Sequence, residues 1–281
     1  MTRAAWINGV VCAGDAPAVS AFDQGLRGLG VFETLRSVDG TLPTLAAHVL
    51  RMRWCGLHLG IDTGADVAAW HAVAAALLDR TGLRDAVLRL FCTRGDGRGL
   101  TRGMTVEPVP DTLEPLRRRG ARVGVSPFRR HVDDPTAGLK LMSYAFCVLA
   151  REEALARGLD EAVLLSPDGH VQEGAFSNVF CLRDGVVYTP TLNGYLLPGV
   201  TRALVLRALR ARGYRCREVT LGPEQFASAD AIWLTSGVWE VMPVVAWCGR
   251  AVPGQDHGLA VHQALRADLA RELRPPGAAT V

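Results

Sequence analysis

The feature that most constrains the fold is a break near residues 108–120, which divides the chain into two parts. Three prolines, three consecutive arginines and a glycine interrupt the strand and helix patterns there, and such residues punctuate regular structure. The chain has 281 residues, which is enough for two domains of about 100–150 residues each. We predict a small N-terminal α/β domain over 1–112, a linker over 113–120 and a larger C-terminal domain over 121–281.

Both parts mix short strands with helices, as judged from the spacing of apolar residues and turn signals. The first part shows a hairpin over 4–12, strands over 31–38, 86–93 and 104–107, and helices from about 45 and over 66–80. The second shows strands over 121–126, 214–219, 231–235 and 241–248, several more between 161 and 189, and helices ending near 158 and over 199–212 and 258–273. Residues 274–281 are expected to be a loose tail. These patterns predict an α/β fold of the α+β type.

Composition narrows the class of protein. Hydrophobic residues make up 49% of the chain and charged residues 21%, so it can bury a core and is not a disordered or low-complexity protein. The seven cysteines form no C-x-x-C pair and no long apolar run is present, which indicates a cytoplasmic protein without disulfides. A net charge of +3 does not favour a nucleic acid or a membrane surface as partner.

Lys140 is the single lysine among 31 basic residues. Arginine supplies a fixed positive charge, whereas lysine can also lose its proton and act as a nucleophile, as in Schiff-base enzymes. Apolar neighbours at the start of a predicted helix would lower the pKa of the Lys140 amine. The alternative is that one lysine remained by chance.

Three further motifs have residues suited to binding an anionic cofactor. Glu173 opens a strand in the run E-G-A-F-S-N, and L-P-G-V-T-R (197–202) opens a helix whose first N–H groups lack partners, a typical phosphate site. Thr235, Ser236 and Gly237 follow an apolar strand, where α/β folds place ligands. Taken singly, these motifs are equally explained as a surface carboxylate, a helix start and a turn. No P-loop, dinucleotide, serine-nucleophile or metal motif is present.

Taken together, the motifs resemble a known family. The order H-V-L-R (48–51), L-K-x-x-S-Y (139–144), E-G-x-x-S-N-x-F (173–180), L-P-G-V-T-R (197–202) and T-S-G (235–237) resembles the fold-type IV pyridoxal-phosphate enzymes, the class IV aminotransferase family. The resemblance extends from about Trp6 to Val244. It implies a small N-terminal α/β lobe and a larger C-terminal lobe with a mixed-strand pseudo-barrel.

The resemblance also implies pyridoxal 5'-phosphate as cofactor and a role for each motif. Lys140 matches the lysine that forms the Schiff base and carries the proton, and Glu173 matches the carboxylate that faces the pyridine nitrogen. Tyr144 matches a tyrosine near the ring oxygen of the cofactor, and Thr34 and Arg98 are expected near the substrate. The residues expected around the cofactor phosphate are Arg51, Gly199, Val200, Thr201, Thr235 and Ser236.

The chain departs from the family pattern near the substrate. Family members commonly read D-R-G-x-x-(Y/F/V)-G-D-G-x-F-E-T, whereas residues 23–34 are one residue shorter and lack the aromatic residue. Ser143 also replaces the asparagine that is usual in the lyases and D-amino-acid enzymes. These departures concern the substrate rather than the cofactor.

The sequence favours one reaction among three alternatives. The loop R-G-D-G-R-G (94–99) resembles that of aminodeoxychorismate lyases, and the Lys140 segment lacks the K-x-x-G-N-Y spacing of branched-chain transaminases. We therefore expect a lyase that converts 4-amino-4-deoxychorismate to pyruvate and p-aminobenzoate. The alternatives are a D-amino-acid or branched-chain transaminase and a non-catalytic scaffold. The family implies a homodimer with a small-molecule amino substrate, and no metal, nucleic acid or membrane partner is expected.

Overall fold

The computed structural model describes residues 3–13, 19–129 and 133–272. The chain divides into two compact units. The first comprises Met1–Pro110 together with Lys140–Tyr144, and the second comprises Asp111–Leu139 and Ala145–Val281. No helix within the described residues is long and apolar enough to cross a membrane.

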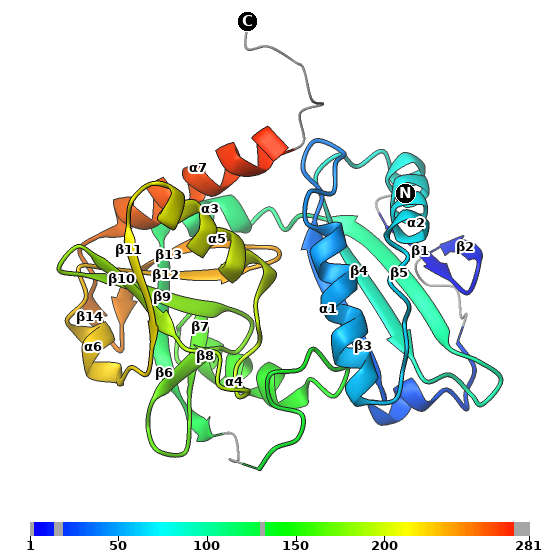
Figure 1. Cartoon of the computed structure of the whole chain (residues 1–281), viewed down its shortest axis with the longest axis horizontal. Helices are drawn as coiled ribbons and strands as arrows, with labels where there is room; N and C mark the ends of the chain where they lie inside the picture. The colour runs from blue at the N-terminus through cyan, green and yellow to red at the C-terminus, as the bar shows by residue number, and fades with distance from the viewer. Residues whose placement is uncertain (1–2, 14–18, 130–132, 273–281) are drawn as a thin grey trace, which may run out of the picture. The chain divides into compact units, whose positions relative to one another are not determined.

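The first unit is built on one antiparallel sheet in the order β2-β1-β5-β4-β3 (Figure 1). Its strands are β1 (Ala4–Ile7), β2 (Val10–Ala13), β3 (Gly30–Arg36), β4 (Ala86–Thr93) and β5 (Thr101–Pro108). Its helices are η1 (Gln24–Arg27), α1 (Leu45–His58) and α2 (Val67–Thr81). Helix α1 packs on β3, and α2 packs on β1 and β5.

Local signals set the ends of helix α2. The Asp66 carboxylate accepts a hydrogen bond of 2.8 Å from the N–H of Ala69, which caps the first turn. Gly82 ends the helix in the left-handed conformation with φ of 69°, which glycine adopts without steric cost. The predicted helix over 66–80 is therefore confirmed to within one residue at each end.

The second unit holds a nine-stranded mixed sheet in the order β11-β10-β9-β12-β13-β6-β7-β8, with β14 paired to β13. Its strands are β6 (Ala121–Arg129), β7 (Glu161–Leu165), β8 (Val171–Gly174), β9 (Asn178–Arg183), β10 (Val186–Pro190), β11 (Arg215–Val219), β12 (Ala231–Ser236), β13 (Glu240–Trp247) and β14 (Arg250–Ala251). Its helices are α3 (Leu113–Arg119), α4 (Ala145–Ala156), α5 (Val200–Ala211), α6 (Pro223–Ala227) and α7 (Gln255–Glu272). Strand β8 also contacts β9 and β10, so the sheet curls back on itself.

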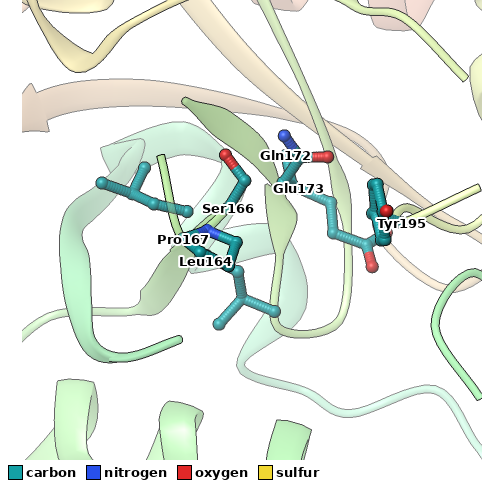
Figure 2. A pocket seen from close by; sticks show the side chains of 7 residues that line it. Leu164, Ser166, Pro167, Gln172, Glu173 and Tyr195 are labelled. Carbon is teal, nitrogen blue, oxygen red and sulfur yellow. The ribbon is translucent and has the colours of Figure 1, made fainter. Parts of the chain in front are cut away.

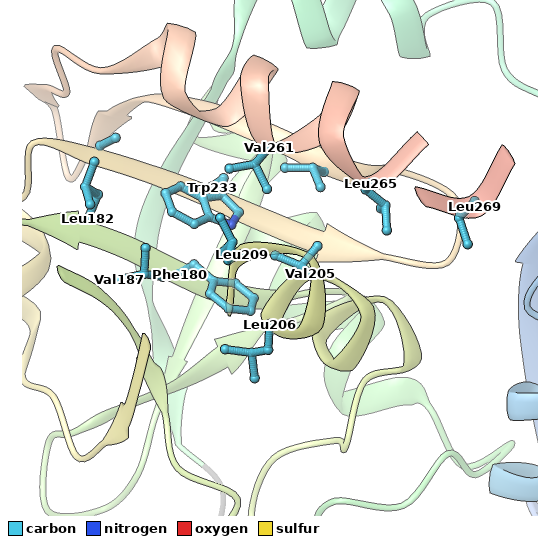
Figure 3. Close-up of a cluster of buried hydrophobic side chains, with 12 residues drawn as sticks. Phe180, Leu182, Val187, Val205, Leu206, Leu209, Trp233, Val261, Leu265 and Leu269 are labelled. Carbon is cyan, nitrogen blue, oxygen red and sulfur yellow. The ribbon is translucent and has the colours of Figure 1, made fainter. Parts of the chain in front are cut away.

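The core of the second unit lies between this sheet and helices α5 and α7 (Figure 3). Phe180 of β9 stacks on Trp233 of β12 with ring centroids 5.7 Å apart. Leu206 of α5 and Leu265 of α7 are buried in the same cluster. Apolar burial of this size fixes β9 and β12 as neighbours, and these strands position two of the motifs singled out in the sequence.

The structure differs from the sequence prediction at the break between the two parts. Residues 113–119, within the predicted linker, form helix α3 of the second unit. Pro115 lies in the first turn of α3, where the missing N–H of proline costs nothing. The short helices η1 and α6 were not predicted, and the tail over 274–281 lies outside the described residues.

Residues 140–144 form an irregular segment that runs beside β3. The N–H of Phe32 donates to the carbonyl of Lys140 over 3.2 Å, and the N–H of Met142 donates to the carbonyl of Gly30 over 2.8 Å. Helix α4 starts only at Ala145. The catalytic lysine expected from the sequence therefore lies on an edge of the first unit, just before the helix predicted to carry it.

Candidate active site

The Lys140 amine lies against a pair of aromatic rings of the first unit, Phe32 and Tyr144, whose centroids are 5.1 Å apart. Its Nζ is 4.7 Å from the centroid of the Phe32 ring and 4.8 Å from that of the Tyr144 ring, and it donates a hydrogen bond of 3.4 Å to the Tyr144 hydroxyl. The backbone N–H of Lys140 donates to the thiol sulfur of Cys55 in α1 over 3.3 Å. Main-chain contacts thus fix the residue and leave its amine half-buried against aromatic faces.

A buried ion pair lies in the same unit. Glu33 of β3 is fully buried, and its two oxygens accept hydrogen bonds of 2.8 and 2.6 Å from Nε and Nη2 of Arg51. Nδ1 of His48 lies 2.6 Å from the same carboxylate. His48 and Arg51 are three residues apart on α1 and therefore share one face of the helix.

Electrostatics in this group favour an ionised carboxylate and a neutral imidazole. Burial alone would raise the pKa of Glu33, but the charges and hydrogen bonds of Arg51 and His48 outweigh burial and lower that pKa to about 2. Burial lowers the pKa of His48, although Glu33 opposes this effect. The Arg51 charge also acts on the thiol of Cys55 and the hydroxyl of Tyr144, so these residues form one cluster with Lys140.

Sequence reasoning missed Glu33 and His48. It assigned Arg51 to the cofactor phosphate, whereas two N–H groups of Arg51 are directed at Glu33. The sequence contained a signal for this ion pair. Val31, Glu33 and Leu35 are every second residue of β3 and lie on its buried face, and a buried carboxylate needs a partner. Thr34 lies on the opposite face of β3, beside Phe32.

Hydrogen bonds of Asp23 hold the loop that precedes β3, near the predicted substrate residues. The Asp23 carboxylate accepts hydrogen bonds from the Gly25 N–H over 2.7 Å and from the Thr93 and Thr101 hydroxyls over 2.6 and 2.5 Å. The shortened loop after Asp23 is thereby joined to the β4–β5 hairpin. Arg98 lies exposed at the tip of that hairpin, where its N–H donates to Asp96 over 3.2 Å.

The second unit gathers the other predicted cofactor residues. Oε2 of Glu173 in β8 accepts a hydrogen bond of 2.9 Å from the N–H of Leu197. Asn178 of β9 joins the two segments, because its Nδ2 donates to the carbonyl of Leu197 over 2.9 Å and to Glu173 over 3.4 Å. Figure 2 shows the Glu173 side chain extending toward Tyr195, along a small pocket that both residues line.

The start of helix α5 offers unpaired donors to an anion. Gly199 precedes the helix in an extended conformation, and among the described residues no side chain caps the first N–H groups, which include those of Val200 and Thr201. A Cβ at Gly199 would lie 1.9 Å from Oδ1 of Asn178, so only glycine fits there. The helix start therefore has the free N–H groups that an anion site requires, and a residue larger than glycine at position 199 would displace its backbone.

Thr235 adds an unpaired buried hydroxyl. It is 1% exposed, and its Oγ1 has no hydrogen-bond partner within the described part of the chain. Thr235 of β12 is the direct strand partner of Asn178 in β9, whereas the neighbouring Ser236 hydroxyl accepts the N–H of Trp239 over 3.1 Å. A buried polar group without a partner is costly, and an anionic ligand would satisfy this one.

The structure thus places the predicted residues in two groups. Lys140, Tyr144, Arg51 and Thr34 belong to the first unit. The second unit contains Glu173, Gly199, Val200, Thr201, Thr235 and Ser236. Within the described residues, no cluster of three or more side chains suited to holding a metal ion is found.

Solved structures with the same fold define the class of protein. A fold IV-transaminase from Curtobacterium pusillum is 30% identical with a TM-score of 0.85, and the match covers 96% of this chain and 100% of that one. A hypothetical aminotransferase from Mycobacterium tuberculosis, in the form with alpha-ketoglutarate and PMP bound, is 25% identical with a TM-score of 0.88, covering 96% and 99% of the two chains. The predicted mixed α/β fold of the fold-type IV enzymes is confirmed.

Sequence comparison identifies the family. Residues 30–247 match the family described as Amino-transferase class IV. A putative branched-chain-amino-acid aminotransferase of Methanocaldococcus jannaschii is 33% identical, covering 90% of this chain and 91% of its own. The aminodeoxychorismate lyase of Bacillus subtilis is 28% identical, covering 85% and 84%. The chain belongs to the class IV aminotransferase family of enzymes, which confirms the resemblance seen in the sequence.

Proposed function

We propose that the protein is a pyridoxal-phosphate enzyme that acts on the amino group of a small substrate. The observation that carries this proposal is the single lysine amine held against the rings of Phe32 and Tyr144, in a chain whose structural relatives include an aminotransferase solved with PMP bound. When bound, the cofactor supplies an electron sink for the bond broken next to the substrate amine.

The residues present fit this cofactor. Lys140 would provide the amine for covalent attachment of the cofactor and the group that moves a proton. The Glu173 carboxylate, oriented by the Leu197 N–H, would stabilise a protonated pyridine nitrogen. The uncapped start of α5 and the unpaired hydroxyl of Thr235 suit a phosphate. The resemblance also implies that Arg51, which Glu33 orients, would contribute a positive charge to phosphate binding.

Transamination is the reaction that the relatives support best. The putative aminotransferase of M. jannaschii is 33% identical, and the D-alanine aminotransferase of Bacillus licheniformis is 29% identical over 84% of this chain. The lyase reaction predicted from the sequence is the second candidate, because the loop over 94–99 resembles that of the lyases. The exposed position of Arg98 provides no buried substrate contact that would favour the lyase reaction.

One experiment separates these reactions. Purified protein with pyridoxal phosphate is given, in separate samples, a panel of L- and D-amino acids and 4-amino-4-deoxychorismate, while pyruvate and the cofactor spectrum are followed. A transaminase converts the cofactor to its amino form with a donor alone. A lyase releases pyruvate without a second keto acid. If no visible band forms and borohydride fixes no pyridoxyl group on Lys140, the chain is a non-catalytic scaffold.

Replacing Thr235 with valine should weaken cofactor binding without weakening the fold. The substitution preserves shape but removes a hydroxyl that has no partner in the described part of the chain, whereas a hydrogen bond to a charged phosphate is worth about 1.5–3 kcal/mol. We expect the Kd for pyridoxal phosphate to rise about tenfold to a hundredfold in an absorbance titration, with unchanged urea unfolding.

Thr189 provides a matched control for this prediction. It is also a fully buried threonine, and its hydroxyl donates to the carbonyl of Val179 over 2.8 Å. Thr189→Val should therefore lower the stability by about 1 kcal/mol and leave cofactor affinity unchanged. Equal Kd values for Thr235→Val and the unmodified protein would remove Thr235 from the phosphate site.

We also propose that the protein forms a homodimer, as the resemblance implies. Helix α1 exposes Leu50, Trp54 and Leu57, which are 56%, 45% and 52% accessible and share one helical face. An apolar stripe of this kind is typical of an interface. Light scattering at micromolar concentration should give the mass of two chains, and Trp54→Glu should reduce that mass. A single-chain mass for the unmodified protein would exclude this proposal.

A further inference from the structure

Helix α4 carries an arginine whose side chain lies between aromatic rings from two different turns. The Cζ atom of Arg151 is 5.0 Å from the centroid of the Phe176 ring and 5.2 Å from that of the Trp239 ring. Phe176 belongs to the turn between β8 and β9, and Trp239 to the turn between β12 and β13. One side chain therefore contacts two turns that are about sixty positions apart in the sequence.

Both turns adjoin residues assigned to the cofactor. The first turn lies between Glu173 and Asn178, and its Gly174 N–H donates to the Ser177 carbonyl over 2.6 Å. The second turn follows Thr235 and includes the hydrogen bond from the Trp239 N–H to the Ser236 hydroxyl. A shift of either turn would move a cofactor contact.

A buried carboxylate completes the arrangement. Glu161 of β7 is fully buried and accepts hydrogen bonds from the N–H groups of Ala162 over 3.0 Å and Phe176 over 3.3 Å. Its Oε2 also lies 3.4 Å from the Ser177 hydroxyl. The first turn is thus fixed from two sides, because Arg151 contacts the ring of Phe176 and Glu161 accepts its backbone N–H.

Charge links Arg151 to Glu161. Burial raises the pKa of Glu161 to about 7, while the positive charge of Arg151 opposes this rise. Nε of Arg151 is itself buried and has no hydrogen-bond partner among the described residues. Since a buried charged group without a full set of hydrogen bonds is costly, the contacts with the Phe176 and Trp239 rings are what hold Arg151 in this position.

We propose that Arg151 is a positioning residue that holds the 174–177 and 236–239 turns in the geometry required for cofactor binding. The proposal rests on the proposed function, because the cofactor is what the two turns would hold. A planar guanidinium can stack against aromatic rings, whereas the compact ammonium of lysine lacks such a planar face. Charge and shape can therefore be tested separately.

The test compares Arg151→Met, Arg151→Lys and the control Arg157→Met. Arg157 follows the same helix but is exposed and pairs with Glu153 over 2.7 Å. Hydrogen exchange of the cofactor-free proteins is measured by mass spectrometry on peptides covering 174–178 and 236–240, and the Kd for pyridoxal phosphate is measured by absorbance titration. Urea unfolding shows which variants fold.

We expect Arg151→Met to accelerate exchange in both turns and to raise the Kd at least about tenfold, the loss expected for desolvated cation–ring contacts. Arg151→Lys, which retains the charge, should show the same change in both turns to a smaller extent. Arg157→Met should change neither quantity. If Arg151→Met does not fold, Arg151→Lys decides the question alone.

Unchanged exchange in either turn of a folded Arg151 variant would overturn the proposal, and so would an unchanged Kd. If the unmodified protein binds no pyridoxal phosphate, the proposed function fails, and the role of Arg151 in cofactor binding fails with it. A protein that binds the cofactor but does not respond to the Arg151 variants refutes the positioning role alone. The two failures are therefore distinguishable.

Discussion

Replacing Lys140 with arginine should abolish covalent attachment of pyridoxal phosphate and lower turnover at least about a thousandfold, because proton transfer by a positioned side chain alone contributes about 10²–10⁴. The guanidinium stays protonated at any pH of interest and is not a nucleophile. The fold should survive, since the hydrogen bonds that Lys140 forms with Phe32 and Cys55 are made by its main chain. The visible band of the bound cofactor should be absent from the variant.

The unique lysine makes this measurement unusually specific. After borohydride reduction, a pyridoxyl group on any lysine side chain of the protein must be at Lys140, and mass spectrometry of its peptide shows whether it is there. Tyr144→Phe is the control, because it keeps the ring beside the amine and removes only the hydroxyl 3.4 Å from Nζ. If the Lys140→Arg protein still acquired a pyridoxyl group or kept its activity, Lys140 would not be the residue that attaches the cofactor.

Replacing Glu33 with glutamine should destabilise the protein by about 3–5 kcal/mol, the cost of leaving one member of a buried ion pair without its partner. Glutamine retains the shape, but the guanidinium of Arg51, only 10% exposed, loses the carboxylate that accepts two of its hydrogen bonds. Urea unfolding followed by circular dichroism measures the loss.

Glu107 provides a control within the same unit. Its carboxylate is partly exposed and lies 3.8 Å from Arg3 and 3.7 Å from Arg89, so Glu107→Gln should cost less than about 1 kcal/mol. If Glu33→Gln and Glu107→Gln lowered the free energy of unfolding by similar amounts, the buried Glu33–Arg51 pair would contribute no more to stability than a surface ion pair does.

Lowering the pH should reduce the stability of the protein through the same Glu33 carboxylate. Because the pKa of Glu33 falls from its ordinary value of 4.5 to about 2 in the folded state, the unfolded state binds more protons between these values. The stability contributed by Glu33 is complete above pH 4.5 and is lost as the pH falls from 4.5 toward 2. Stability measured across this range should therefore depend less on pH in Glu33→Gln than in the unmodified protein.

Much of the fold could be predicted from local patterns. The strand-like run over 86–93 and the helical pattern over 199–212 predicted β4 and α5 closely, because each element carries its own local pattern and end signals. Helix α3 was missed because Pro115 and the three arginines that follow indicate a linker. Its packing on β13, which the local sequence does not show, stabilises the helix. Domain boundaries at 112 and 120 remain a prediction.

The candidate site was only partly predictable for a related reason. Lys140 stands out because it is unique in the sequence, and Glu173 and Thr235 stand out through the order of their motifs. The pairing of Arg51 with Glu33 depends on how α1 packs on β3, and the contact of Arg151 with Phe176 and Trp239 depends on the sheet bringing distant turns together. Such contacts leave no local signal, so only the folded chain shows them.

The position of residues 140–144 has a consequence for dividing the protein. This segment packs with the first unit although the chain on either side of it belongs to the second. A fragment ending at Pro110 would contain Phe32 and Cys55 but no lysine, and a fragment beginning at Asp111 would contain the lysine without those neighbours. Neither fragment could assemble the amine's surroundings alone, so only complementation between the two could restore them.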